Sequence, residues 1–224
     1  MARRFEIFYD VVSPYSFIGF EMACRLRDTW KINLLLKPFF LGGVMKSSGN
    51  TPPAIQCQTK GIYMMKDLEN LSRHYNVPVK IDHENFAKVA FEKTTLKPMR
   101  YLTAIDMAYP QFTEELSRQF WISFFCKIQD ITEPDVIRET STRAGLNKEQ
   151  VEKAFEDATS SETKERLTSL TKEAVELGAF GAPWFVIHGK DGKQHTVFGS
   201  DRWGVIADIL DEEYPGPMRK LSKT

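Results

Sequence analysis

The chain of 224 residues predicts an α/β fold in which strands from both ends of the chain form one sheet around a large all-helical insertion. Two observations predict it. Strand-like segments occur only near the two ends, and the long middle of the chain spaces its apolar residues as helices do. Because neither terminal set of strands can bury itself alone, we expect the two sets to pair into one sheet.

The first segment predicts a strand–helix–strand unit. Residues 5–12 are dense in aromatic and β-branched residues, which is typical of a buried strand. Apolar residues from Phe17 to Leu26 then keep helical spacing, and residues 32–39 predict a second buried strand. So short a unit predicts that its two strands run parallel.

The middle of the chain begins with a loop rich in turn formers at residues 42–53 and continues with helical patterns. Thr132 with Asp135, and Asn147 with Gln150, resemble capping boxes that start two of these helices. The predicted helices span residues 61–75, 98–108, 112–128, 133–144, 148–158 and 162–177.

The last segment returns to strands. Residues 183–188 and 194–198 flank an Asp-Gly step that is typical of a hairpin turn, and Ser200-Asp201 opens a final amphipathic helix. The whole order predicts a thioredoxin-like fold. We expect one discontinuous domain over residues 1–58 and 178–224, with the helical insertion over residues 59–177.

Composition narrows the class of protein. Thirty Lys and Arg balance thirty Asp and Glu, so no basic footprint for nucleic acid is present. The three cysteines cannot all pair within one chain and match no zinc spacing, so we expect a reducing compartment and no metal. No apolar run reaches the length of a membrane span, and a strand starting by Phe5 leaves no room for a secretory leader.

The turn Ser13-Pro14-Tyr15-Ser16 occupies the place where redox enzymes of this fold carry two cysteines. A serine there cannot exchange disulfides, yet the start of a helix favours negative charge nearby. Ser13 can therefore donate a hydrogen bond to an incoming anion, or it can simply cap the helix. A role as nucleophile lacks support, because none of the four histidines lies in a recognisable catalytic pattern.

Four segments, "FYDVVSPYS", "GNTPP", "GAFGAP" and "FGSDR", together resemble the kappa-class glutathione transferases, in the same order over nearly the whole chain. The resemblance implies a DsbA-like architecture and transfer of glutathione to small electrophiles, with peroxide reduction as a further activity. It implies glutathione as co-substrate, no tightly bound cofactor, and a homodimer. It places the protein in the mitochondrial matrix, with the peroxisome or cytosol as alternatives. The C-terminal Ser222-Lys223-Thr224 approaches a peroxisomal Ser-Lys-Leu signal but lacks its leucine.

The resemblance also assigns the residues that bind glutathione. Ser13 holds its sulfur, the backbone beside a cis-proline holds its peptide, and residues of the last motif hold its γ-glutamyl group. Several of these residues also have a simpler interpretation: Lys60 as a solvated cation, Asn50 as a turn residue, Pro183 as a strand start, and Ser200-Asp201 as a helix cap. The implied site residues are Ser13, Pro14, Tyr15, Asn50, Lys60, Ala182, Pro183, Ser200 and Asp201.

Two other functions stay open at this point. A related branch comprises glutathione-dependent 2-hydroxychromene-2-carboxylate isomerases, and a thioredoxin fold can also serve as a non-enzymatic chaperone or scaffold. Cys57 belongs to the same loop region as Asn50, and its thiol is either reactive or unreactive. Cys24 and Cys126 fall among aromatic residues, so we expect both in the core.

Overall fold

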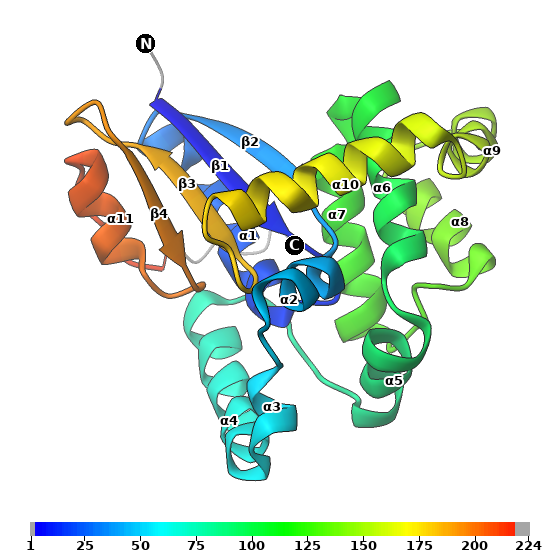
Figure 1. Cartoon of the computed structure of the whole chain (residues 1–224), viewed down its shortest axis with the longest axis horizontal. Coiled ribbons are helices and arrows are strands. Elements are labelled where there is room, and N and C mark those ends of the chain that lie inside the picture. Colours follow the sequence, from blue (N-terminus) through cyan, green and yellow to red (C-terminus); the bar gives the residue numbers. More distant parts are fainter. Residues whose placement is uncertain (1–2, 218–224) are drawn as a thin grey trace.

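The computed structural model describes residues 3–217, and their strands form the single mixed sheet that the sequence predicts (Figure 1). The strand order is β2-β1-β3-β4. β1 (Arg3–Tyr9) runs parallel to β2 (Ile32–Pro38) and antiparallel to β3 (Trp184–His188), which pairs antiparallel with β4 (Gln194–Phe198). The sheet therefore joins the two ends of the chain, as a thioredoxin-like fold requires.

Helices fill the segment between the two halves of the sheet and complete both ends (Figure 1). A π-helical stretch follows α5, and a second one extends α7. The α-helices are α1 (Pro14–Thr29), α2 (Leu41–Ser48), α3 (Pro53–Gln56), α4 (Gln58–Tyr75), α5 (His83–Ala87), α6 (Leu96–Ala108), α7 (Thr113–Trp121), α8 (Pro134–Arg143), α9 (Lys148–Asp157), α10 (Ser161–Glu176) and α11 (Trp203–Leu210); η1 (Lys88–Lys93) and η3 (Ile122–Cys126) are π-helical, and η2 (Pro110–Phe112) is 3₁₀.

The alternation of side chains along β1 divides the core between the two faces of the sheet. Phe5, Ile7 and Tyr9 belong to a core shared with α1, α11 and much of the helical insertion. Phe8 belongs to a smaller core on the other face, together with residues of α2 and α10. The insertion therefore covers both faces, and the main core runs continuously from the sheet into the inserted helices.

Helix α2 occupies part of the segment that the sequence predicts as a loop, so that prediction is wrong. Two glycines stand in this helix because neighbours leave no room for larger residues. A Cβ at Gly42 would lie 2.8 Å from the Phe40 ring, and one at Gly43 would lie 3.1 Å from Thr171 on α10. Close packing of α2 on α10 thus overrides the poor helix propensity of glycine.

The two capping boxes that the sequence predicts have different outcomes. The capping box of Asn147 and Gln150 is confirmed at the start of α9. The one at Thr132 is wrong, because Thr132 bonds to Asp130 and Glu133 is the N-cap of α8. The helical stretch of α5 and η1 was not expected.

The cysteine predictions also differ in outcome. Cys24 is buried, as expected, but Cys126 is exposed at the end of η3, so its core assignment is wrong. The Cys126 thiol lies 3.3 Å from the Pro78 carbonyl, toward which it donates. Its aromatic neighbours Phe124 and Phe125 are buried in the core, whereas Cys126 is the last residue of η3 and faces away from it.

The insertion meets α1 at a dense contact that we call the α1–α7 junction, formed by Phe17 and Phe20 of α1 with Trp121 of α7. The Phe17 and Trp121 rings stack with centroids 5.2 Å apart. Phe20 meets Trp121 edge-on at 4.9 Å, and the Tyr9 ring lies 5.4 Å from Trp121. All four rings are buried.

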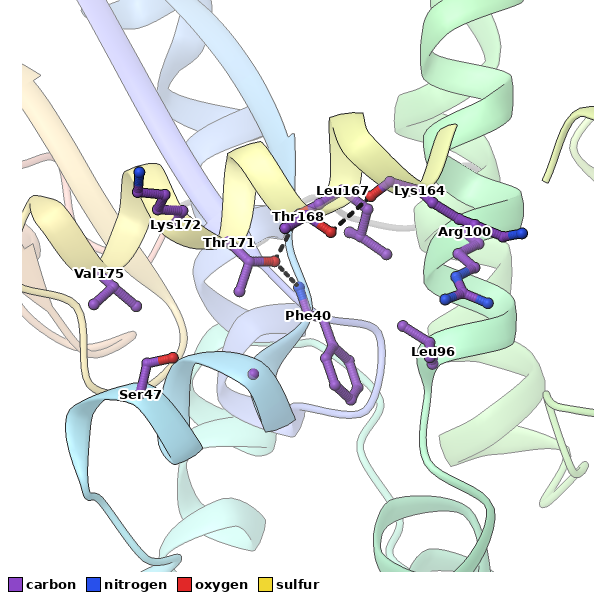
Figure 2. Close-up of a pocket in the computed structure, with 11 residues that line it drawn as sticks. Phe40, Ser47, Leu96, Arg100, Lys164, Leu167, Thr168, Thr171, Lys172 and Val175 are labelled. Atoms are coloured by element: carbon purple, nitrogen blue, oxygen red, sulfur yellow. Dashed lines mark hydrogen bonds between the residues drawn. The ribbon is translucent and has the colours of Figure 1, made fainter. Parts of the chain in front are cut away.

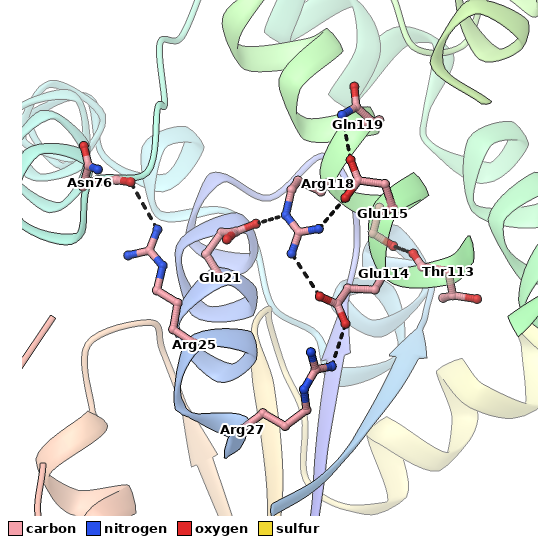
Figure 3. A network of polar contacts seen from close by, with 10 residues as sticks. Glu21, Arg25, Arg27, Asn76, Thr113, Glu114, Glu115, Arg118 and Gln119 are labelled. Carbon is pink, nitrogen blue, oxygen red and sulfur yellow. Dashed lines mark hydrogen bonds and ion pairs between the residues drawn. The ribbon is translucent and has the colours of Figure 1, made fainter. Parts of the chain in front are cut away.

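Ion pairs line the outer side of the α1–α7 junction (Figure 3). Arg118 binds Glu21 of α1 at 2.6 Å and also binds Glu115 and Glu114 of its own helix. Arg27 of α1 binds Glu114 at 2.7 Å. Burial opposes ionisation of Glu114, but hydrogen bonds from Arg27 and Arg118 hold its pKa below the usual value. Every charge of this junction has a partner.

No helix within residues 3–217 combines the length and the apolar character that crossing a bilayer needs.

Candidate active site at the start of helix α1

Ser13 is the N-cap of α1, and its hydroxyl lies between the helix start and the loop before β3. The Ser13 Oγ accepts a hydrogen bond from the Ser16 N–H at 3.0 Å and donates to the Ala182 carbonyl at 3.4 Å. The side chain is 6% exposed. Ser13 therefore does cap the helix, and the weak bond to Ala182 leaves its proton available to a better acceptor.

Pro183 follows a cis peptide bond after Ala182, as the sequence analysis predicts. The proline packs directly over the first turns of α1. A Cβ at Gly19 would lie 3.0 Å from the Pro183 Cγ and 3.1 Å from the Phe185 ring, so this position needs a glycine for the close approach. The Ser13 turn and the Ala182-Pro183 loop are therefore fixed against each other.

Two further segments close around this loop. The Asn50 amide, two residues after α2, donates to the Phe180 carbonyl at 2.7 Å. The Gly199 N–H donates to the Pro183 carbonyl at 3.2 Å, which places Ser200 and Asp201 beside the proline. The structure thus gathers at one place four motifs that are far apart in the sequence.

Ser200 is buried, and its hydroxyl has no hydrogen-bond partner in the described part of the chain. Its carbonyl accepts from the Trp203 indole at 2.7 Å. The helix α11 starts at Trp203 with Arg202 as N-cap and without a capping side chain. The interpretation of Ser200-Asp201 as a helix cap is therefore wrong, because the chain turns once more before the helix begins.

The tyrosine of the turn reaches the insertion. The Tyr15 hydroxyl donates to the Asp67 carboxylate of α4 at 2.9 Å. Burial and this bond raise the pKa of Tyr15, and the negative charge of Asp201 raises it further. Asp201 is 48% exposed and so faces solvent close to Tyr15. The negative charge at this end of the site comes from Asp201 and Asp67.

Lys60 stands apart from the other predicted residues. It is exposed in the first turn of α4, and no contact joins it to the Ser13 turn within residues 3–217. Its neighbour is Cys57, the N-cap of α4. Backbone N–H groups of Lys60 and Thr59 lower the pKa of the Cys57 thiol.

Asp10 is a residue that the sequence analysis missed, although it lies three positions before Ser13. Its carboxylate accepts from the Val12 N–H at 3.0 Å, the Leu41 N–H at 2.9 Å and the Thr95 hydroxyl at 2.8 Å. Its carbonyl accepts from the Ser13 N–H at 3.1 Å. Burial raises the pKa of Asp10 to about 6, against these hydrogen bonds. The available signal was a charged residue near the end of a run that is dense in aromatic and β-branched residues.

This geometry can bind a soft anion. At the start of α1 Pro14 has no N–H and the Ser16 N–H bonds to the Ser13 Oγ, which leaves the Tyr15 N–H without an acceptor in the helix. The helix dipole favours negative charge there. Ser13 adds a hydroxyl donor. No cluster of three or more His, Cys, Asp or Glu side chains within the described residues is arranged to hold a metal ion.

The chain matches the DSBA-like thioredoxin domain family over residues 4–211. It is 40% identical to glutathione S-transferase kappa 1 of Homo sapiens over 97% of this chain and 95% of that protein. It is 38% identical to the Rattus norvegicus protein of the same name, over 96% of this chain and 94% of that one.

Solved structures share the fold at low sequence identity. A 2-hydroxychromene-2-carboxylate isomerase superposes with a TM-score of 0.73 at 16% identity, over 93% of this chain and 94% of that one. The cytosolic disulfide reductase DsbM of Pseudomonas aeruginosa gives 0.66 at 15% identity, over 93% and 95%. Together with the sequence matches, these results show that the chain belongs to the DSBA-like thioredoxin family and, within it, to the kappa-class glutathione S-transferases.

Proposed function

We propose that this glutathione transferase binds glutathione at the start of α1, where the Ser13 hydroxyl donates a hydrogen bond to the glutathione thiolate. The observation that carries this proposal is the position of Ser13, which caps α1 and holds its proton only loosely on Ala182 at 3.4 Å. When glutathione binds, the Ser13 hydroxyl exchanges the neutral Ala182 carbonyl for the charged thiolate as its acceptor, and hydrogen bonds to charged acceptors are stronger.

The gain is sufficient to activate the thiol. A hydrogen bond to a charged group contributes roughly 1.5–3 kcal/mol. At about 1.4 kcal/mol per pKa unit, one such bond lowers a thiol pKa from about 8.5 by one to two units. The thiolate sulfur then attacks the electrophilic carbon of a small substrate, whose leaving group departs with the electron pair. Ser13 stays uncharged throughout. The same thiolate can attack one oxygen of a peroxide, which forms an S–O bond, breaks the O–O bond and releases an alkoxide that takes up a proton. A second glutathione then reduces the resulting sulfenic acid and gives glutathione disulfide and water.

The remaining residues would hold the two ends of glutathione. The backbone of Pro14, Tyr15 and Ala182 lines the cysteinyl part, and Asn50 reaches the same loop. We assign the unpaired Ser200 hydroxyl to the γ-glutamyl carboxylate and the exposed Asp201 carboxylate to its ammonium group. Lys60 is assigned to the glycyl carboxylate, which requires α4 to approach the Ser13 turn.

Ser13→Ala tests the role of the hydroxyl. Ultraviolet thiolate absorbance of the glutathione complex, titrated against pH, should give a thiolate pKa higher by about one to two units, with a loss of turnover that shrinks as pH rises. Ser16→Ala is the matched control, because the Ser16 hydroxyl is buried one turn further along and has no hydrogen-bond partner among residues 3–217. Equal thiolate pKa values in wild type and Ser13→Ala would exclude this mechanism.

Asp201→Ala tests the far end of the site. Since this carboxylate lies away from the sulfur, its loss should raise KM for glutathione and leave kcat nearly unchanged. An unchanged KM would remove Asp201 from the site.

Activity assays separate the alternatives. Conjugation of a halonitrobenzene supports transfer and excludes a purely non-enzymatic scaffold. Conversion of a hydroxychromene carboxylate without conjugation would assign the isomerase reaction instead. Reduction of cumene hydroperoxide with glutathione tests the peroxidase activity.

Assembly and location complete the proposal. We infer a homodimer, supported by exposed apolar side chains of α3 and α4, namely Ile55, Ile62 and Tyr63. Light scattering of the wild type should give twice the chain mass, and Tyr63→Lys should shift it toward the monomer.

We infer the mitochondrial matrix as the location, to be tested by fractionation. The C-terminal tripeptide of the peroxisomal alternative lies outside the described residues.

A further inference from the structure

A hollow lies between α2, α6 and α10 (Figure 2). It is a cavity of about 420 Å³, and none of the residues assigned to glutathione lines it. Its walls are mainly apolar: Phe40 lies before α2, Leu96 starts α6, and Leu167 and Val175 project from α10. A cavity of this size and character fits the ordinary range of small-molecule sites.

The charged side chains that line this cavity are all positive. Arg100 of α6 and Lys164 of α10 line it at the same end, above Leu96 (Figure 2), and no carboxylate is among its lining residues. Neither cation has an ion pair with any carboxylate of residues 3–217. Lys172, at the other end, pairs with Glu176 at 3.5 Å. Arg100 is half-buried, so its lack of a counterion is unusual beside the fully paired Arg118.

The walls of the cavity are held in place without a ligand. The Phe40 N–H donates to the Thr171 hydroxyl at 3.0 Å, which ties the start of α2 to α10. The next residue, Leu41, and the residue before Leu96 both bond to the buried Asp10 carboxylate. The cavity is therefore preformed, and a ligand would not have to order its walls.

We propose that the cavity between α2, α6 and α10 binds a small organic monoanion with an apolar body, of the aryl-alkyl carboxylate class. The Arg100 guanidinium and the Lys164 ammonium take the carboxylate, and the apolar part lies along Leu96 and Leu167 against the Phe40 ring. The positive charges of Arg100 and Lys164 disfavour a metal ion as the ligand. A polyanion would place its further negative charges against the apolar walls. A neutral lipid would leave both cations unpaired.

Calorimetric titration of the full chain with 4-phenylbutyrate and 4-phenylbutan-1-ol tests the charge requirement. S-hexylglutathione is present at saturation to occupy the proposed thiol site. We expect the carboxylate to bind at least about tenfold more tightly than the alcohol, as one charge-assisted hydrogen bond allows. Arg100→Gln should remove this difference. Lys97→Gln, an exposed cation of the same helix outside the cavity, should retain it.

A filling variant tests the location. Thr168 is exposed at the rim, so Thr168→Trp should block the cavity and abolish binding of both probes without loss of thermal stability. Ser169→Trp, its exposed neighbour outside the lining, is the control.

Three results would overturn the proposal. The two probes could bind equally, or Thr168→Trp could retain binding. Alternatively, Arg100→Gln could change the mass of the assembly in light scattering and leave probe binding intact, which would identify this face as a contact between copies. Activity with glutathione does not enter any of these readouts, so they stand apart from the test at Ser13.

Discussion

Two of the contacts between the inserted helices and the thioredoxin part differ in how completely they are filled. At the α1–α7 junction four aromatic rings are buried together and every charge is paired (Figure 3). At the contact of α2 with α6 and α10, which we call the α2–α10 junction, a cavity of about 420 Å³ remains, and Arg100 and Lys164 form no ion pair with any described residue (Figure 2). Both contacts join the same two parts of the chain.

The difference in packing between the two junctions indicates that they have different roles. A contact that only holds a fold together is expected to reach the packing density of a protein interior and to satisfy its polar groups. The α1–α7 junction packs its rings closely and pairs its charges, although the buried Trp121 indole N–H has no hydrogen-bond partner among the described residues. It supports the helix on which Ser13 stands. The α2–α10 junction leaves apolar surface and positive charge open, which stabilises nothing by itself. We conclude that the first junction is structural and that the second retains space for a ligand.

Trp121→Ala should give the largest effect. Its ring contacts Phe17, Phe20 and Tyr9 and is fully buried, so its loss should reduce the free energy of unfolding by about 3–5 kcal/mol, measured by urea denaturation. Val175→Ala, at the cavity of the α2–α10 junction, removes only two methyl groups from a half-buried side chain and should cost under about 1 kcal/mol. Similar losses at both positions would contradict the contrast between the junctions.

Asp10→Asn tests how the α2–α10 junction is held. Because the pKa of Asp10 is raised from 3.8 to about 6 in the fold, the folded state binds the extra proton between these values. The free energy of unfolding of the wild type should therefore fall as pH rises from about 4 to 6, by roughly 3 kcal/mol at about 1.4 kcal/mol per pKa unit.

The asparagine variant cannot titrate and should lack this slope, so the difference between the two proteins should be largest near pH 4. Unfolding curves in urea at several pH values give both slopes, and the other groups cancel in the difference. A difference that does not vary with pH would show that Asp10 is not held as a buried, titrating carboxyl group.

Arg118→Met should have an intermediate effect on the α1–α7 junction. It leaves Glu21, Glu114 and Glu115 close together without their shared partner. Since Arg118 is about one-quarter exposed, we expect a loss of about 1–3 kcal/mol, below that of a fully buried pair. A double-mutant cycle with Glu21→Gln measures the coupling, and additive losses would show that the pair contributes nothing.

Arg100→Gln should have the smallest effect on stability. The guanidinium has no ion pair among the described residues and lies near a second cation, Lys164, so its removal should change the free energy of unfolding by under about 0.5 kcal/mol. Thermal unfolding with and without 4-phenylbutyrate checks this. A large loss without the probe would show that Arg100 supports the fold.

The sequence by itself determined the features whose signals are local. The composition of residues 5–12 and 32–39 identifies the parallel pair, and Asn147 with Gln150 carries a complete capping box within four positions. The four motifs around Ser13, Asn50, Pro183 and Ser200 indicate the site, because the resemblance was read as one pattern across the chain. Their roles in binding glutathione stay predictions.

Tertiary structure decided whatever depends on contacts between distant segments. The Asp10 carboxylate accepts hydrogen bonds from Leu41 and Thr95, which lie 31 and 85 positions later in the sequence. No local sequence pattern around Asp10 predicts these two partners. The glycines of α2 become helical because the Phe40 ring and α10 lie close. Cys126, the last residue of η3, is exposed although its neighbours Phe124 and Phe125 are buried. Helical period and capping act between neighbours along the chain, whereas burial, pairing of charges and empty space are set by which elements pack together.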